Sequence, residues 1–186
     1  KYNDFELIIS DNFSNPQYSC KEICENASIE NLFYFRPESH LSMVSNWNFS
    51  LSKASGDYIC FFTDKMMLLP DTLQNLADIL SHEQHDIVSW IYDRYIPDSY
   101  DDFLGPGLHI SAKNFFYEGE EYLPGPYDPK EILQKKADCH KPRSHLNSSE
   151  FTRSKICFGA YSRKLVDKAI RIFGQLFHNI SPDYSS

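Results

Sequence analysis

The sequence predicts an α/β protein whose mostly parallel sheet carries helices on both faces. Two observations lead to this class. Short apolar runs, the pattern of strands buried on both faces, alternate in the first half of the chain with segments of helical periodicity. Their spacing fits strand–helix–strand crossovers, which make consecutive strands parallel. The length of 186 residues suits one compact domain, so we expect a single domain spanning 1–186.

The first crossover unit is predicted between strands at residues 5–10 and Leu32–Phe35, both of which are apolar runs. A cluster of turn-forming residues follows the first strand and leads into a helix. We expect Ser14 to cap this helix, with Ile23 and Cys24 on its inner face.

The alternation continues through four further elements. Apolar residues at helical spacing predict a helix over Met43–Ala54, with Gly56 as its stop. Tyr58–Phe62 and Asp86–Tyr92 are the third and fourth apolar strands. Between them we expect an amphipathic helix capped by Asp71. Its apolar positions are Leu73, Leu76, Ile79 and Leu80.

The second half of the chain is less regular. Residues 96–150 are rich in Pro, Gly, Tyr and charged residues and lack periodicity, so we expect an irregular segment. A final helix is predicted over Arg163–Phe173, with Ser162 as its N-cap and Gly174 at its end. The residues expected to face inward on this helix are Leu165, Ala169, Ile170 and Phe173.

The composition argues against several classes of protein. A net charge of -8 argues against a nucleic-acid-binding surface, because phosphate backbones require clustered Lys and Arg. No apolar run approaches the ~20 residues that cross a bilayer, and the start does not resemble a secretory signal. Five cysteines without paired-motif spacing favour idle thiols in a reducing, cytoplasmic setting. The polar start, which passes directly into a strand, leads us to expect a trimmed N-terminus.

Two aspartates follow predicted parallel strands. Asp11 comes after the first strand and Asp64 after the third. Because ligands of open α/β sheets bind beyond the carboxyl ends of the strands, both acids are candidates for one binding crevice. Each one alone could equally be a turn or capping residue, which is a common use of Asp.

Three segments resemble a known family. Glu6–Ser14 ends an apolar strand in an acid, Asn48–Ile59 contains Ala-x-Gly-Asp-Tyr-Ile, and Phe61–Pro70 places Asp64 ahead of a proline. In this register they resemble the family-2 glycosyltransferases. The resemblance implies a GT-A (Rossmann-like) fold that lacks the family's first strand. Residues 1–92 would bind the nucleotide sugar, and 93–186 would form the irregular acceptor side.

The resemblance also implies the donor and the residues that bind it. The donor would be a nucleoside diphosphate sugar, with UDP as the expected nucleotide and Asp11 at its uracil. The family's arginine before the matched asparagine is Trp47 here. The nucleotide-sugar-binding residues that we assign on this basis are Asp11, Asn12, Arg36, Asn48, Thr63, Asp64 and Lys65.

The metal site expected from the family is altered. Thr63-Asp64-Lys65 stands where the family has an Asp-x-Asp motif, so Asp64 is the remaining candidate ligand for Mg²⁺ or Mn²⁺. Lys65 would repel a metal but could neutralise the diphosphate as a point charge. Three interpretations stay open: metal binding through Asp64 with outer ligands, Lys65 in place of the metal, or loss of activity.

The acceptor side offers one candidate catalytic residue. Asp183, in Ser181-Pro182-Asp183-Tyr184, resembles the acidic acceptor-side segment in part of the family and would act as the general base of an inverting hexosyltransferase. His178 is a second candidate, although its position favours a surface or packing role. The acceptor would be a glycan or a lipid-linked sugar in polysaccharide biosynthesis, which is compatible with peripheral membrane association.

Two other functions remain to be distinguished. The altered Asp-x-Asp motif is compatible with a non-catalytic module that binds nucleotide sugar or glycan without turnover. A nucleotidyltransferase on a related α/β fold would require a Gly-rich phosphate loop near its start, and the sequence contains none there.

Overall fold

The computed structural model describes most of the first half of the chain and the end of the second. The described residues are 2–17, 19–90, 92–96, 108–110, 125–131, 134 and 156–178. The chain forms two compact units, Lys1–Asp86 with Tyr161–Ser186, and Ile87–Ala160. The sequence analysis divided the chain by function, into a donor-binding part (1–92) and an acceptor part (93–186). That division stays a prediction. The α/β class is confirmed by the element order, in which strands and helices alternate through the first unit.

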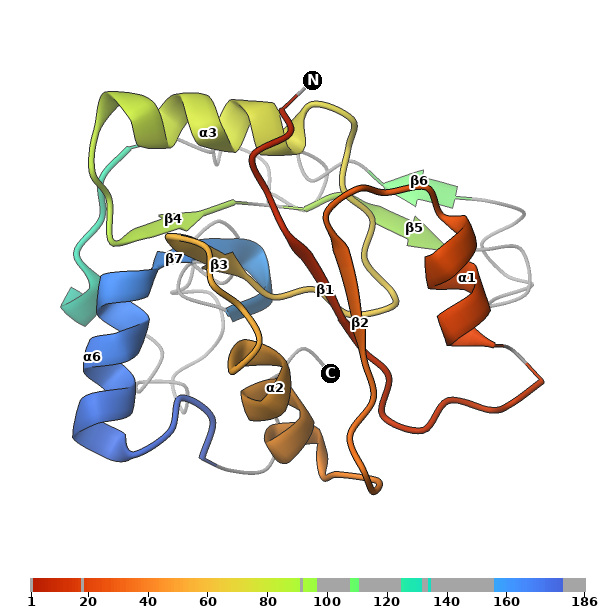
Figure 1. Cartoon of the computed structure of the whole chain (residues 1–186). Helices are drawn as coiled ribbons and strands as arrows, with labels where there is room; N and C mark the ends of the chain where they lie inside the picture. The colour runs from red at the N-terminus through yellow and green to blue at the C-terminus, as the bar shows by residue number, and fades with distance from the viewer. Residues whose placement is uncertain are drawn as a thin grey trace. The chain divides into compact units, whose positions relative to one another are not determined.

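The first unit is built on a parallel strand pair (Figure 1). Strand β1 (Leu7–Ser10) lies beside β2 (Leu32–Phe35), with Leu7 opposite Leu32 and Ser10 opposite Phe35. The Asp11 N–H extends the ladder by donating to the Phe35 carbonyl at 2.9 Å. Both strands and the crossover between them agree with the sequence prediction, apart from two residues at the start of β1.

Helix α1 (Cys20–Asn26) connects these strands and begins later than predicted. Its N-cap is Ser19, whose hydroxyl accepts the Glu22 N–H at 3.2 Å. The prediction of Ser14 as cap was wrong because the Ser14 N–H donates to Asp11 and belongs to the preceding turn. Ile23 is 65% exposed, so its predicted place on the inner face was also wrong.

Helix α2 (Met43–Leu51) packs against β1 and ends three residues earlier than predicted. It is capped by Ser42, and its last residue, Leu51, is buried. Gly56 does not terminate it. The N–H groups of Ser55 and Gly56 instead donate to the carboxylate of Glu6, which fixes the turn that enters the next strand.

Strand β3 (Tyr58–Cys60) and helix α3 (Thr72–His82) follow. The strand is two residues shorter than predicted, because a turn starts at Thr63. Asp71 precedes the helix as predicted, but its side chain makes no capping hydrogen bond. Ile79 is 47% exposed, whereas the three leucines predicted for the apolar face are half-buried.

Strand β7 (Gly159–Ser162), preceded by a short 3-10 turn (Ile156–Phe158), was missed by the sequence analysis. All four of its residues are buried. Within the first unit its neighbour is β3. The Ser162 N–H donates to the Asp86 carbonyl at 2.9 Å, and the Ser162 hydroxyl donates to the Asp86 carboxylate at 2.7 Å. These bonds join the two stretches of chain that make up the first unit, at Asp86 and Ser162.

Helix α6 (Arg163–Phe173) has the predicted bounds and the predicted ends. The Ser162 hydroxyl accepts the Leu165 N–H, and Gly174 ends the helix with φ 84°, a conformation that glycine adopts readily. Its most buried residue is Val166, which is 2% exposed. The inward orientation predicted for Phe173 was wrong, because this last residue of the helix is 64% exposed.

The second unit contains a strand that agrees with prediction and an antiparallel strand pair that was not predicted. Strand β4 (Ile87–Ser89) occupies the centre of the predicted fourth strand, and the Trp90 N–H donates to the Phe158 carbonyl at 3.0 Å. Strands β5 (Arg94–Ile96) and β6 (Leu108–Ile110) pair antiparallel. Strand β6 therefore lies inside the segment for which the sequence predicted no regular element.

Candidate functional site

A hollow opens in the first unit at the carboxyl ends of β1 and β2, the edge where the sequence analysis placed a binding crevice. Its volume is about 690 Å³. Asp11 lies on its wall, together with residues from the turn after β1, the start of α1 and the end of β2. The lining residues are Asp11, Ser14, Asn15, Pro16, Ser19, Cys20, Lys21, Tyr34, Phe35 and Arg36.

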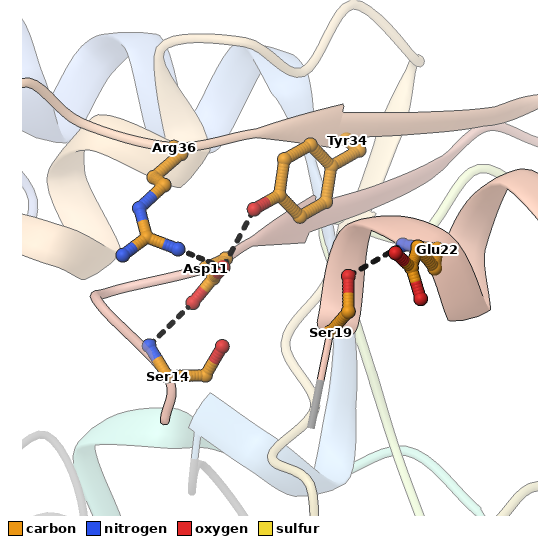
Figure 2. A network of polar contacts seen from close by, with 6 residues as sticks. All are labelled: Asp11, Ser14, Ser19, Glu22, Tyr34 and Arg36. Atoms are coloured by element: carbon orange, nitrogen blue, oxygen red, sulfur yellow. Dashed lines mark hydrogen bonds and ion pairs between the residues drawn. The ribbon is translucent and has the colours of Figure 1, made fainter. Parts of the chain in front are cut away.

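Asp11 is the centre of a hydrogen-bond network in this hollow (Figure 2). One carboxylate oxygen accepts the Ser14 N–H at 2.7 Å. The other accepts the Tyr34 hydroxyl at 2.6 Å and the Arg36 guanidinium at 3.0 Å. Tyr34 and Arg36 lie two positions apart on the β2 segment, which places both side chains on the face toward Asp11.

The network keeps the Asp11 carboxylate ionised although the residue is only 5% exposed. Burial by itself would raise the pKa of Asp11, but the hydrogen bonds from Tyr34 and Ser14 and the charge of Arg36 outweigh it and hold the pKa below its usual range. The same contact with Asp11, with some burial, raises the pKa of Tyr34. Tyr34 therefore remains a donor at neutral pH.

The Asp11 carboxylate is engaged on both oxygens and its side chain is 2% exposed. A carboxylate offers about four acceptor positions. The Ser14 N–H, Tyr34 and Arg36 occupy three of them, and the Ser14 hydroxyl adds a further hydrogen bond. Arg36 keeps donors beyond the one bonded to Asp11, and its side chain is 40% exposed. The exposed polar groups that the network presents to a ligand are therefore the donors of Arg36, with the Asp11 carboxylate behind them.

The Phe13 ring packs against the Arg36 guanidinium. The guanidinium carbon lies 4.5 Å from the centre of the Phe13 ring, a cation–π contact that keeps the guanidinium plane in place. Phe13 adopts a positive φ of 65°, uncommon for a bulky side chain, and is 40% exposed beside the site. The edge of the His40 ring faces it, with ring centres 6.5 Å apart.

Two predicted binding residues, Asn12 and Asn48, are engaged with the backbone. The Asn12 amide donates to the Leu41 carbonyl and accepts the Leu41 N–H, both at 2.9 Å. The Asn48 amide makes the same double contact with Phe177, at 2.9 and 3.2 Å. Both residues fix the chain around the site and do not line the hollow, so their contact with a ligand stays a prediction.

The turn after β3 carries Thr63, Asp64 and Lys65. The Met66 N–H donates to the Thr63 carbonyl at 3.1 Å, which closes the turn. Asp64 and Lys65 are both exposed, and neither lines the hollow that contains Asp11. Among the predicted donor-binding residues, the structure thus brings together Asp11 and Arg36.

Helix α2 is attached to the ends of both strands that carry the predicted site. The Ser10 hydroxyl, at the end of β1, donates to Asn46 at 2.7 Å. The Phe61 ring, just after β3, stacks on Trp47 with ring centres 5.5 Å apart. Because Asn46 and Trp47 are neighbours on α2, this helix holds the Asp11 and Thr63 turns in a fixed relation.

The described residues around Asp64 do not fit a complete metal site. A divalent cation held by protein needs several oxygen ligands, and Asp64 is followed by a cationic lysine. Within the described part of the chain there is no group of three or more His, Cys, Asp or Glu side chains that could hold a metal ion. Among the described residues, Asp64 alone is therefore a candidate ligand at this turn.

Sequence reasoning missed Tyr34 and Phe13 as site residues. The signal for Tyr34 was its spacing of two from Arg36 at the end of an apolar strand, which puts both side chains on one face. Asp183 lies outside the described residues. His178 is exposed, and its ring edge faces Phe173 with centres 6.1 Å apart.

Comparison with known proteins identifies one family. The family model for glycosyl transferase family 2 matches residues 1–141, which include the hollow, α2 and the Thr63–Lys65 turn. No curated protein and no solved structure matches the chain. In the part of the chain that the structure describes, no helix is both long and apolar enough to span a bilayer.

Proposed function

Because the chain belongs to glycosyl transferase family 2, we propose that it transfers a hexose from a UDP-linked donor to a lipid-linked or glycan acceptor with inversion. Family membership supports a GT-A type α/β domain and glycosyltransferase activity in general. The observation that carries the choice of donor is the Asp11–Tyr34–Arg36 network in the hollow beyond β1 and β2. In this proposal residues 1–92 bind the donor, and residues 93–186 provide the acceptor side of polysaccharide synthesis in the cytoplasm.

The polar groups of the network match uracil. The uracil imide has one N–H between two carbonyl oxygens. In this proposal the Asp11 carboxylate accepts that N–H in exchange for the Ser14 hydroxyl, and Arg36 has donors for a neighbouring carbonyl. Guanine presents a ring N–H and an amino group side by side and would require two acceptors. The exposed Phe13–Arg36 pair adds a flat surface against which a base can stack.

Calorimetric titration with UDP, dTDP and GDP tests the donor. We expect UDP and dTDP to bind more tightly than GDP by about 1–3 kcal/mol, because GDP would leave a buried polar group without a partner. Comparing three diphosphates keeps the phosphate contribution constant. Equal affinity for all three, or preference for GDP, would contradict the assignment of the hollow to uracil.

Lys65 supports a donor site that depends little on a divalent metal. Family-2 enzymes commonly use one, yet Lys65 occupies the place of the second acidic ligand, and an exposed ammonium can neutralise a diphosphate directly. We propose that Lys65 contacts the diphosphate and that Asp64 and Thr63 lie beside it. Mg²⁺ or Mn²⁺ would then bind through Asp64 and the diphosphate itself, and only weakly.

Replacing Lys65 with Asp should make UDP binding depend on Mn²⁺. The unmodified protein should bind UDP with less than about a fivefold difference with and without Mn²⁺, whereas Lys65→Asp should bind poorly without the metal and recover with it. Lys130→Asp, at an exposed lysine that does not line the hollow, is the matched control. An unmodified protein that needs Mn²⁺ for tight UDP binding would contradict the role of Lys65.

A second candidate function is supported by the same turn. With a single carboxylate in Thr63-Asp64-Lys65, a module that binds nucleotide sugar or glycan without turnover would retain the Asp11 network and lack transfer. The two candidates differ in one observable. An active enzyme consumes the donor when an acceptor is present, whereas the binding module binds the donor and leaves it intact.

A further inference from the structure

The outward side of α6 carries a basic stripe. Lys164, Lys168 and Arg171 are spaced by four and three residues, which places them on one side of the helix. All three are exposed, whereas Val166 on the other side is 2% exposed. Asp167, the single acidic residue of this helix, stands three positions after Lys164 and four before Arg171 and borders the stripe. Three cations against one acid leave this side positively charged although the whole chain carries -8.

The stripe is continued by one exposed apolar side chain, Ile172, which is 61% exposed and follows Arg171 in the last turn. Phe173 is also exposed, but it stands seven positions after Val166 and therefore lies on the other side of the helix. Cationic side chains beside large apolar ones are typical of helices that lie on membranes, where the cations meet anionic headgroups and the apolar groups enter the acyl boundary.

We propose that Lys164, Lys168, Arg171 and Ile172, here called the α6 surface, dock onto a bilayer that contains anionic lipid. A second copy of the chain is a poorer partner, since a two-fold contact would place the stripe against itself. The acidic net charge does not prevent docking. At physiological salt, charges farther than ~8 Å from the lipid are largely screened, so the stripe dominates at contact.

The α6 surface ends close to the predicted donor turn. Phe177, four residues after Phe173, contacts the Phe61 ring with centres 5.1 Å apart, and Phe61 stands two positions before Thr63. Docking would therefore hold this turn near the lipid, where a lipid-linked acceptor is presented. This consequence rests on the proposed function, whereas the docking itself does not.

Vesicle co-sedimentation with matched triple variants tests the docking. The full chain is mixed with phosphatidylcholine vesicles with and without phosphatidylglycerol. We expect binding only when phosphatidylglycerol is present, and K164Q/K168Q/R171Q should weaken it roughly a hundredfold, since each cation contributes about fivefold. The control K21Q/K53Q/K130Q removes the same charge from exposed lysines elsewhere and should bind nearly like the unmodified protein.

Three outcomes would overturn the proposal. One is equal binding to both kinds of vesicle, and another is equal loss in the two triple variants, which would indicate bulk charge alone. The third is a lipid-free dimer that the α6 variant dissociates. Ile172→Ser should weaken vesicle binding by about tenfold, whereas Ile23→Ser, at a residue 65% exposed on α1, should not. Calorimetry with UDP on K164Q/K168Q/R171Q and Ile172→Ser, whose residues do not line the hollow, separates this test from that of the donor site.

Discussion

Replacing Phe177 with Ala should lower the free energy of unfolding by about 3–5 kcal/mol, the usual cost of removing a buried phenylalanine. Phe177 is 8% exposed. Its ring meets Trp47 and Phe61 edge-on, with centres 5.2 and 5.1 Å apart. The variant would leave a cavity beside α2, the helix that holds both predicted site turns.

Urea denaturation followed by tryptophan fluorescence measures this effect, because the Trp47 ring lies against Phe177. The matched control is Phe173→Ala. Phe173 stands four positions earlier and is 64% exposed, so its loss should change the free energy of unfolding by no more than about 0.5 kcal/mol. A Phe177→Ala cost below about 1 kcal/mol would show that the aromatic cluster does not hold the end of the chain to α2.

Replacing Asp183 with Asn should slow sugar transfer about a hundredfold or more and leave donor binding intact, the usual effect of losing a general base. The assignment rests on the resemblance of Ser181-Pro182-Asp183-Tyr184 to acceptor-side acids of the family. An amide of the same size cannot accept the acceptor hydroxyl proton, whereas UDP binding depends on the hollow around Asp11.

UDP release from a UDP-sugar in the presence of a lipid-linked acceptor measures the transfer rate. Calorimetry with UDP on the same preparation verifies that the variant is folded and binds donor. Asp167→Asn, at an exposed residue of α6, is the matched control and should transfer at the unmodified rate. An Asp183→Asn enzyme that transfers as fast as the unmodified one would exclude Asp183 as the base.

The sequence was sufficient where a structural feature is set by neighbouring residues. The ends of α6 were predicted because Ser162 and Gly174 cap the helix locally. The place of Asp11 was predicted because an acid at the carboxyl end of a buried strand is a local pattern. The first helix was the exception, because Asp11 binds the Ser14 N–H in the preceding turn and the helix is capped by Ser19 instead.

The sequence was insufficient where partners lie far apart in the chain. Strand β7 has four residues, all buried, so it shows neither alternation nor length. The Asn48 amide is satisfied by Phe177, 129 positions later, which no local pattern indicates. The Asp11–Tyr34 bond spans 23 positions and depends on the parallel register of β1 and β2.

The central claim, that Asp11 accepts the imide N–H of a uracil nucleotide, is tested most directly by comparing UDP with its N3-methyl analogue. The analogue keeps the diphosphate and both carbonyl groups and lacks only that N–H, so the protein itself is unchanged. Calorimetry should show a loss of about 1–3 kcal/mol for the analogue with the unmodified protein. With Asp11→Ala, UDP should be weakened by a similar amount, and the two ligands should bind alike. Equal affinities of UDP and N3-methyl-UDP for the unmodified protein would contradict the claim.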